Sequence, residues 1–288
     1  MSARQVEVTP PSPYRLPAHS SEDRTMSVRD GVVSRLLRVG ESPVLVRAWE
    51  PGRGRVALRA EPVAAAALAP PRSLPPPVSR PAGRDELELA IERMRFALAV
   101  DDDLTPFYRR FRRDPLLGPQ LRRRPWLRPT RRPWAWEALA WAVVKQLIET
   151  ERAARIQRRI VGRWGVRLGR ERGGLCDVPG AATIAGRAPA ELAALDLSPG
   201  RSVALRAVAR EIAAGRVAPG EPAGDRRLLA IPEIGPWTVQ CLGLFGRGDP
   251  DSLPAGDLIY LKLVGRLARL GRRATVEEVE EFYAPYEP

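Results

Sequence analysis

Several residue types are scarce in this chain, and each scarcity argues against a kind of site. The 288 residues include one histidine, His19, and two cysteines, Cys176 and Cys241. Because the sequence has no C-x-x-C pair and no cluster of cysteine with histidine, it supports neither a zinc site nor an iron–sulfur cluster. We therefore expect no metal and no cofactor, and we expect both cysteines to be reduced core residues.

The chain also lacks a long hydrophobic run. No stretch of about 18 consecutive apolar residues occurs in it, which argues against a membrane-spanning helix. The first residues, MSARQVEVTPPSPYRLP, do not contain the apolar segment of an export signal. We therefore expect no membrane partner and a cytoplasmic protein.

Lysine is scarce as well, although the net charge is strongly positive. Lys145 and Lys262 are the only lysines among 47 basic residues, and the formal net charge is +13. Such a surplus indicates an anionic partner, which is usually nucleic acid. Arginine, alanine, glycine and proline are also what a GC-rich genome produces, so charge alone leaves both explanations open.

The distribution of residue types predicts an α+β fold with two domains. Short apolar runs at residues 32–37, 44–47 and 56–59, divided by glycine and proline, predict an antiparallel β-meander. The proline-rich residues 69–83 predict a connector and the domain boundary. We therefore predict a β-rich domain at residues 1–80, with the connector at its end, and a mostly helical core at residues 81–288.

Three segments admit a structural explanation beside a functional one. Residues 10–23 are rich in proline and serine, so we expect disorder there, and His19 within them has no carboxylate partner for catalysis. The Asp101-Asp102-Asp103 triplet marks a helix end and a new start before Pro106 better than it marks a metal site. The basic run at residues 122–132 fits either a surface that contacts a phosphate backbone or a solvated loop.

The most informative stretch is residues 225–246, which predicts two short helices joined by a tight turn. Apolar residues between 228 and 231 give the first helix a buried face, and Pro232 ends it. The second helix opens at Pro236 or Trp237 and stops near Gly246 and Gly248. A turn that feeds a helix N-terminus offers free backbone N–H groups and a positive dipole end, so it can hold a phosphate without reading a base.

A Gly/Pro-rich loop at residues 247–257 follows and delivers one carboxylate, Asp257. An aspartate after glycine is a good helix N-cap, so Asp257 could serve only to cap a helix that begins at Leu258. Capping and catalysis are compatible, because helix N–H groups would position the carboxylate and keep it ionised.

These two segments together resemble the helix-hairpin-helix plus Gly/Pro…Asp motif of the DNA glycosylase superfamily, specifically the DNA-3-methyladenine glycosylase II type. The matching residues are Leu229-x-Ile231-Pro232-x-Ile234-Gly235-x-Trp237-Thr238 and Pro254-Ala255-Gly256-Asp257. The resemblance covers roughly residues 85–282. The two isolated cysteines disfavour the iron–sulfur branch of the superfamily, because that branch needs a cluster of cysteines.

The resemblance implies a function and assigns roles to residues. The implied enzyme hydrolyses the N-glycosidic bond of alkylated purines in duplex DNA after turning the nucleotide out of the helix. Asp257 would be catalytic and would stabilise the sugar cation, while Trp237 would form the floor of the base pocket. Trp237 occupies the position of the Schiff-base lysine in glycosylases with lyase activity, so the implied enzyme is monofunctional. The residues implied in DNA binding are Glu233, Ile234, Gly235 and Thr238 of the hairpin, and Gln146 and Leu147.

Leu147 has two interpretations. The family resemblance implies that Gln146 and Leu147 supply the wedge that fills the gap left by the turned-out base. A leucine at helical spacing is also an ordinary core residue, and this alternative stays open. We expect a break near Glu149 and Thr150, where one helix ends and another begins.

Three departures from the family pattern affect the expected site. Glu233 stands where the family has glycine, which removes easy access to positive φ and places a carboxylate beside the expected phosphate. Cys241 replaces a position that is often aromatic in the pocket wall. The sequence stops at Pro288, before the aromatic segment that relatives usually carry, which predicts a more open pocket or an incomplete chain.

Two other functions remain as alternatives. A non-catalytic DNA-binding protein would keep the hairpin without a working pocket, and a glycosylase for oxidised bases would add lyase activity. The sequence does not choose among damaged bases, since selectivity depends on the shape of the pocket. We expect a monomer.

Overall fold

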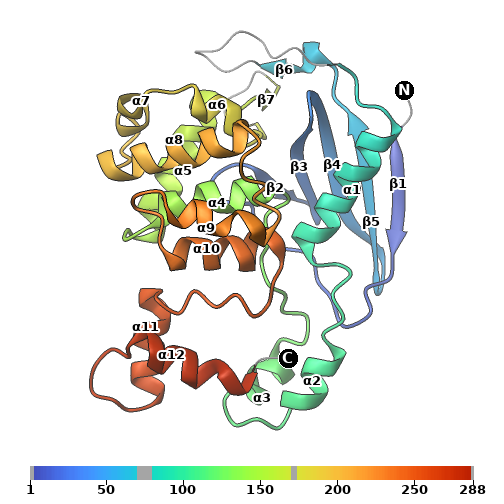
Figure 1. Cartoon of the computed structure of the whole chain (residues 1–288). Helices are drawn as coiled ribbons and strands as arrows, with labels where there is room; N and C mark the ends of the chain where they lie inside the picture. The colour runs from blue at the N-terminus through green and yellow to red at the C-terminus, as the bar shows by residue number, and fades with distance from the viewer. Residues whose placement is uncertain (1–2, 70–79, 170–173, 287–288) are drawn as a thin grey trace.

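The computed structural model describes residues 3–69, 80–169 and 174–286. Its N-terminal part is a five-stranded antiparallel sheet with the strand order β1-β5-β4-β3-β2 (Figure 1). The runs predicted from the sequence are confirmed as β3, β4 and β5, whereas the two outer strands were not predicted. The strands are β1 (Arg4–Val8), β2 (Met26–Arg29), β3 (Val32–Val39), β4 (Ser42–Gly52) and β5 (Arg55–Pro62).

Helix α1 (Arg84–Leu98) covers one face of this sheet (Figure 1). Its buried residues Leu87, Ile91 and Met94 recur at helical spacing and share a core with Val44 and Val46 of β4. The helix that follows the proline-rich connector therefore packs with the sheet. Most of the connector lies outside the described residues, and the domain boundary at residue 80 stays a prediction.

The expected disorder of residues 10–23 is wrong. Ser12 accepts a hydrogen bond from Arg128, and the Tyr14 hydroxyl donates to the carbonyl of Leu98 at 2.8 Å. Asp23, at the end of the segment, is 2% exposed. Groups from distant parts of the chain hold this proline-rich stretch in place, and its composition alone does not reveal them.

The rest of the described chain is mainly helical, which confirms the predicted α+β class. Short strands β6 (Leu68–Ala69) and β7 (Arg167–Leu168) pair with each other. None of the helices in the described ranges is long and apolar enough to cross a membrane. The helices are α2 (Thr105–Phe111), α3 (Gly118–Arg123), α4 (Ala135–Lys145), α5 (Thr150–Trp164), α6 (Ala181–Ala185), α7 (Pro189–Ala193), α8 (Pro199–Ala213), α9 (Asp225–Leu229), α10 (Pro236–Leu242), α11 (Leu258–Leu267) and α12 (Val276–Tyr283).

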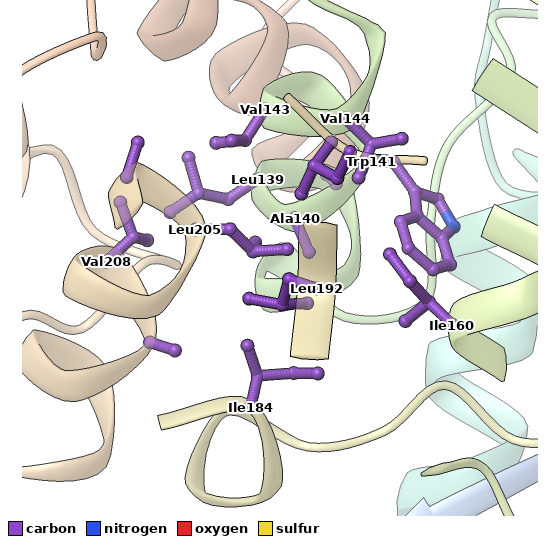
Figure 2. Packing of buried hydrophobic residues seen from close by; sticks show 14 of the residues in the cluster. Leu139, Ala140, Trp141, Val143, Val144, Ile160, Ile184, Leu192, Leu205 and Val208 are labelled. Carbon is purple, nitrogen blue, oxygen red and sulfur yellow. The ribbon is translucent and has the colours of Figure 1, made fainter. Parts of the chain in front are cut away.

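Helix α4 lies at the centre of the helical core. Figure 2 shows its residues Leu139, Ala140 and Val143 facing Leu205 and Val208 of α8. Helix α4 ends at Lys145 and α5 begins at Thr150, so the predicted break between them is confirmed. Because α4 is packed along its length, the position of its C-terminal end is fixed.

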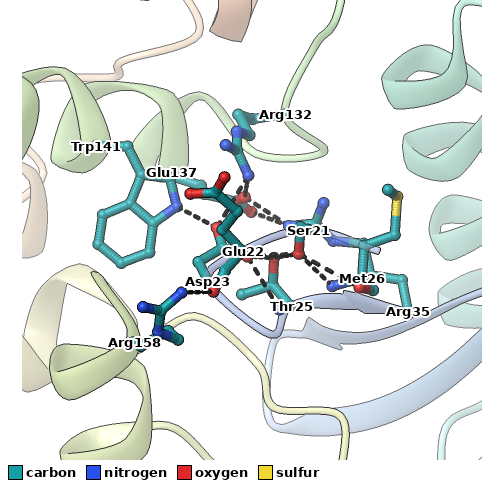
Figure 3. Close-up of polar contacts among 10 residues, drawn as sticks. All are labelled: Ser21, Glu22, Asp23, Thr25, Met26, Arg35, Arg132, Glu137, Trp141 and Arg158. Carbon is teal, nitrogen blue, oxygen red and sulfur yellow. Dashed lines mark hydrogen bonds and ion pairs between the residues drawn. The ribbon is translucent and has the colours of Figure 1, made fainter. Parts of the chain in front are cut away.

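A buried polar cluster joins the sheet to α4 (Figure 3). Arg35 of β3 donates to both carboxylate oxygens of Glu137, at 2.5 and 2.6 Å. Arg132 bridges Glu137 and Asp23, at 3.1 Å to each carboxylate. The indole N–H of Trp141 donates to Asp23 at 3.1 Å. Each buried charge has an opposite partner, so the cluster fixes the orientation of α4 relative to the sheet.

Helices α11 and α12 form a smaller unit below α10 in Figure 1, next to α2 and α3. Their own core contains Ala255, Val264, Ala274 and Val279. Phe111 of α2 packs on Tyr286, with ring centroids 5.3 Å apart. The C-terminal helices are thus held by the segment that precedes α4.

Candidate functional site

The predicted hairpin is present as α9, a turn and α10. Helix α9 ends at Leu229, before Pro232, and α10 begins at Pro236, as predicted. After Leu242 a π-helical turn at Gly243–Arg247 extends α10 and ends at Gly248, which has φ of 76°. In the described part of the chain the amide of Gly235 has no hydrogen-bond partner, so it remains available at the turn.

Glu233 adopts the positive φ that its residue type disfavours, with a value of 71°. Its carboxylate lies beside the start of α8, since a Cβ atom built on Gly200 would stand 3.1 Å from Glu233 Oε1. Arg201 and Glu233 also attract each other electrostatically. The negative charge of Glu233, which we expected to repel a phosphate, is therefore partly compensated by the N-terminus of α8 and by Arg201.

Gln146 ties the end of α4 to the hairpin. Its side-chain amide donates to the carbonyl of Glu233 at 2.7 Å and to Thr238 Oγ1 at 2.9 Å. Arg201 completes the junction by donating to the carbonyls of Val144 and Gln146. The structure thus brings together two segments that the sequence predicted separately.

Leu147 follows directly and points into solvent. It is fully exposed, with a relative accessibility of 103%, and it adopts the left-handed conformation with φ of 52°. This exposure excludes the alternative that Leu147 is an ordinary core residue. A leucine in the left-handed conformation is strained, and because such strain clusters at functional sites, its position favours a functional role for this side chain.

The other hairpin residues divide into exposed and buried ones. Ile234 and Thr238 are 4% and 1% exposed, so their side chains position the turn from within. Glu233 is exposed and Gly235 is partly exposed at the tip of the turn. Any contact of the turn with a strand would therefore be made by its backbone and by Glu233.

Asp257 caps α11 and also faces α10. Its Oδ1 accepts a hydrogen bond from the amide of Ile259 at 2.8 Å, and its Oδ2 accepts one from the indole N–H of Trp237 at 3.2 Å. Both side chains are partly exposed. The carboxylate is therefore oriented by two donors and remains reachable from outside.

Two further side chains near Asp257 were not singled out as candidates from the sequence. Burial and the neighbouring Tyr283, together with the charge of Asp257, raise the pKa of Tyr260. Tyr260 lies on the first turn of α11 and meets Tyr283 edge-on at 5.8 Å between ring centroids. Lys145 lies near Cys241, because its charge acts on that thiol. Its position three residues after a capping aspartate, on the first turn of the helix, is the sequence signal that could have pointed to Tyr260.

Cys241 is a buried thiol beside the site. Burial, with the negative charge of Asp257, raises the pKa of Cys241 to about 12. The thiol is therefore protonated at neutral pH and acts as a small apolar group. A small side chain at this position leaves more room next to Trp237 than an aromatic side chain would.

The second half of the basic run at residues 122–132 is used inside the protein, whereas Arg122, Arg123 and Arg124 are exposed. Arg128 bonds to Ser12, Arg131 pairs with Asp102 at 2.8 Å, and Arg132 belongs to the buried cluster. These contacts favour the structural explanation over a phosphate-contacting surface for the second half of the run. Among the described residues, no group of three or more His, Cys, Asp or Glu side chains is arranged to hold a metal ion.

Comparison with solved structures defines the class of fold. The chain aligns over 98% of its length with 91% of the 3-methyladenine DNA glycosylase from Archaeoglobus fulgidus, with a TM-score of 0.74 and 18% identity. A structure of MBOgg1 with a low-affinity DNA ligand aligns over 98% of this chain and 91% of its own, with a TM-score of 0.69 and 14% identity. The fold is that of the helix-hairpin-helix DNA glycosylases.

Comparison with curated proteins shows which glycosylases the sequence resembles. The chain is 26% identical to the DNA-3-methyladenine glycosylase of Bacillus subtilis (strain 168) over 214 residues, which are 72% of this chain and 71% of the relative. Two Mycobacterium tuberculosis proteins, each named as a probable bifunctional transcriptional activator/DNA repair enzyme AlkA, match 32 residues at 53% identity, only 6% of their length. No family model matches. The resemblance to the DNA-3-methyladenine glycosylase group, predicted from the hairpin and Asp257, is confirmed.

Proposed function

We propose that this protein is a monofunctional DNA glycosylase that hydrolyses the N-glycosidic bond of alkylated purines in duplex DNA. The observation that carries this proposal is the position of Asp257. A partly exposed carboxylate stands at the N-terminus of α11, facing the Trp237 indole, in a fold shared with glycosylases. The relative from Bacillus subtilis, which is named a 3-methyladenine glycosylase, supports the substrate class.

In this proposal Asp257 stabilises the transition state of bond cleavage. Breaking the glycosidic bond places positive charge on the sugar, and a fixed carboxylate beside the sugar lowers the energy of that charge. The hydrogen bonds from Ile259 and Trp237 hold the carboxylate in one orientation before the substrate arrives. The same carboxylate orients the attacking water.

A purine alkylated on a ring nitrogen suits a site with one carboxylate. Such a base is already cationic, so it leaves without a general acid. Trp237 supplies an aromatic surface beside the carboxylate, and an aromatic face attracts a cation more strongly than a neutral base. Tyr260 of α11 adds a second aromatic side chain to this surface. The small Cys241 leaves space for the base.

The partner is double-stranded DNA, from which the nucleotide must be turned out at a cost of a few kcal/mol. Leu147 fills the gap, and Gln146 connects it to the hairpin turn, whose backbone grips a phosphate. The proposed reaction uses no metal and no cofactor. We further propose that the protein acts as a monomer in the cytoplasm.

The decisive experiment compares the Asp257→Asn protein with wild type on duplexes that carry 3-methyladenine, 7-methylguanine, hypoxanthine or an etheno base. Asparagine remains a good N-cap, so the fold should persist. We expect single-turnover base release to fall by about 10²-fold or more, as when a group that stabilises transition-state charge is removed. Asp251→Asn, on the exposed loop before Asp257, is the matched control and should retain wild-type release.

Other outcomes would select another function. Equal release by the Asp257→Asn and wild-type proteins would refute the role of Asp257. If wild type bound duplex DNA in a salt-sensitive way but released no base from the panel, the non-catalytic alternative would replace the proposal. A covalent protein–DNA adduct after borohydride reduction would instead indicate lyase activity.

A further inference from the structure

A basic hollow lies between α11 and the loop that leads to α12. We call it the α11 hollow, and no acidic residue lines it. Two of its cationic side chains, Lys262 and Arg266, come from α11, the helix that Asp257 caps, and the others come from the loop. The lining residues are Lys262, Gly265, Arg266, Arg269, Gly271, Arg272 and Arg273.

Backbone packing brings these cations together. The loop crosses directly over Gly265, where a Cβ atom would stand 2.2 Å from the carbonyl oxygen of Arg272. The amide of Leu270 donates to the carbonyl of Gly265 at 2.9 Å, and the amide of Ala274 donates to that of Leu261 at 2.9 Å. Since only glycine allows this close approach, the loop arginines are held against the helix.

Most of the charge in the hollow is uncompensated. Arg272 pairs with Glu278 of α12 at 2.6 Å. Lys262, Arg266, Arg269 and Arg273 are all exposed and have no ion-pair partner within the described part of the chain. Holding several like charges close together raises the free energy of the protein, and an anionic partner would lower it.

The spacing of the cations fits one strand of DNA. Lys262 and Arg266 are four residues apart on α11, which is about 6 Å along the helix axis. Two nucleotide steps along one strand of B-DNA rise about 7 Å. Arg269 extends the row past the end of the helix. The row begins five residues beyond Asp257, about 7.5 Å along the axis, so it leads away from the proposed reaction centre.

We propose that the α11 hollow binds the backbone phosphates of duplex DNA beside the nucleotide that Asp257 acts on. This inference rests on the proposed function, and it assigns to α11 a second role besides presenting the carboxylate. Contacts from lysine and arginine to phosphates carry no sequence information, so the hollow adds affinity on any flanking sequence. The hairpin turn precedes Asp257 in the chain and the hollow follows it. The hollow would therefore be a second place at which the protein holds the DNA.

The test measures how the affinity for duplex DNA depends on salt. The Arg266→Gln/Arg269→Gln protein is compared with wild type on one undamaged duplex and on one that carries hypoxanthine. Each lost phosphate contact reduces the slope of log K against log salt by about 0.9, so we expect a reduction of about 1.8 on both duplexes. The control is Arg29→Gln/Arg53→Gln, which removes two exposed arginines, one at the end of β2 and one in the turn after β4, and should keep the wild-type slope.

The possible outcomes test the role of the α11 hollow separately from the proposed glycosylase activity. Equal slopes for the Arg266/Arg269 and wild-type proteins would overturn it, even if wild type released damaged bases normally. Reduced slopes together with no base release from any damaged duplex would support the hollow and count against the glycosylase. Should the double variant unfold, Lys262→Gln, which removes one exposed charge, must lower the slope by about 0.9 for the proposal to stand.

Discussion

The side chain of Gln146 lies between the end of α4 and the first turn of α10, 2.9 Å from Thr238 Oγ1. Its second hydrogen bond reaches the carbonyl of Glu233, the residue at the tip of the hairpin turn. The turn that would grip a phosphate and the turn that presents Leu147 are therefore one connected unit. A displacement of either turn would move the other.

Replacing Gln146 with alanine should weaken this unit. The change removes two hydrogen bonds, and we expect the free energy of unfolding to fall by about 1–2 kcal/mol. It should also weaken binding to damaged duplex, because the hairpin and Leu147 lose their fixed separation. Chemical denaturation and equilibrium binding measure the two effects. A variant that lost stability but kept wild-type affinity would contradict the coupling between the turns.

Leu147→Gly should separate stability from activity. Leu147 makes few contacts and has a positive φ, so glycine should leave the protein as stable as wild type or more stable by about 1 kcal/mol. Base release should nevertheless fall, since no side chain remains to fill the gap that the turned-out base leaves in the duplex. Single-turnover release and thermal unfolding measure the two properties. Val203→Ala, which truncates another exposed apolar side chain, should change neither.

Glu233 offers a matched pair of substitutions. Glu233→Gly removes the carboxylate and relieves the positive φ, so we expect a gain of about 1 kcal/mol in the free energy of unfolding. Glu233→Ala removes only the carboxylate and should give no such gain. If the carboxylate opposes DNA, both variants should bind duplex more tightly than wild type. A gain in affinity with glycine alone would assign the effect to the backbone instead.

Asp23 should make the stability of the protein depend on pH in acid. Although burial raises its pKa, the nearby Arg132, Ser21, Arg35 and Thr25 outweigh burial and hold the pKa of Asp23 below its ordinary value. A depressed pKa contributes stability that is fully present above the unfolded value of about 3.9 and is lost as pH falls toward the folded value.

We therefore expect Asp23→Asn to be less stable than wild type by about 1.5–3 kcal/mol at pH 7, because a charged hydrogen-bond acceptor is lost. The difference should shrink below about pH 4, where Asp23 is protonated in the unfolded chain. Urea denaturation between pH 3 and 7 measures it, with Glu41→Gln as an exposed control. A difference that stayed constant over this range would contradict the assignment.

The sequence predicted the hairpin and the Asp257 loop because short-range chemistry determines both. Pro232 and Pro236 limit the two helices, and an aspartate before Leu258 caps the next one. The central strands were predictable for the same reason, since their apolar runs are bounded by glycine and proline. These features depend on residues a few positions apart.

What the sequence did not predict depends on residues far apart in the chain. Residues 10–23 are ordered because Arg128 and Arg132 reach them from more than 100 positions away. The exposure of Leu147 follows from the left-handed turn after α4, which helical spacing does not foretell. The orientation of the Glu233 carboxylate depends on Gly200 at the start of α8. Periodicity and capping rules describe neither long-range ion pairs nor the direction of a side chain.

The buried charges between β3 and α4 give the N-terminal sheet a role in orienting α4. Glu137 sits near one end of the helix whose other end carries Gln146 and Leu147. A fragment without residues 1–80 would lack Arg35 and Asp23, the partners of Glu137 and Arg132. The orientation of α4 would then no longer be fixed by these ion pairs. The sheet thus sets the angle at which a leucine about ten residues further along, almost three turns of helix away, would enter a double helix.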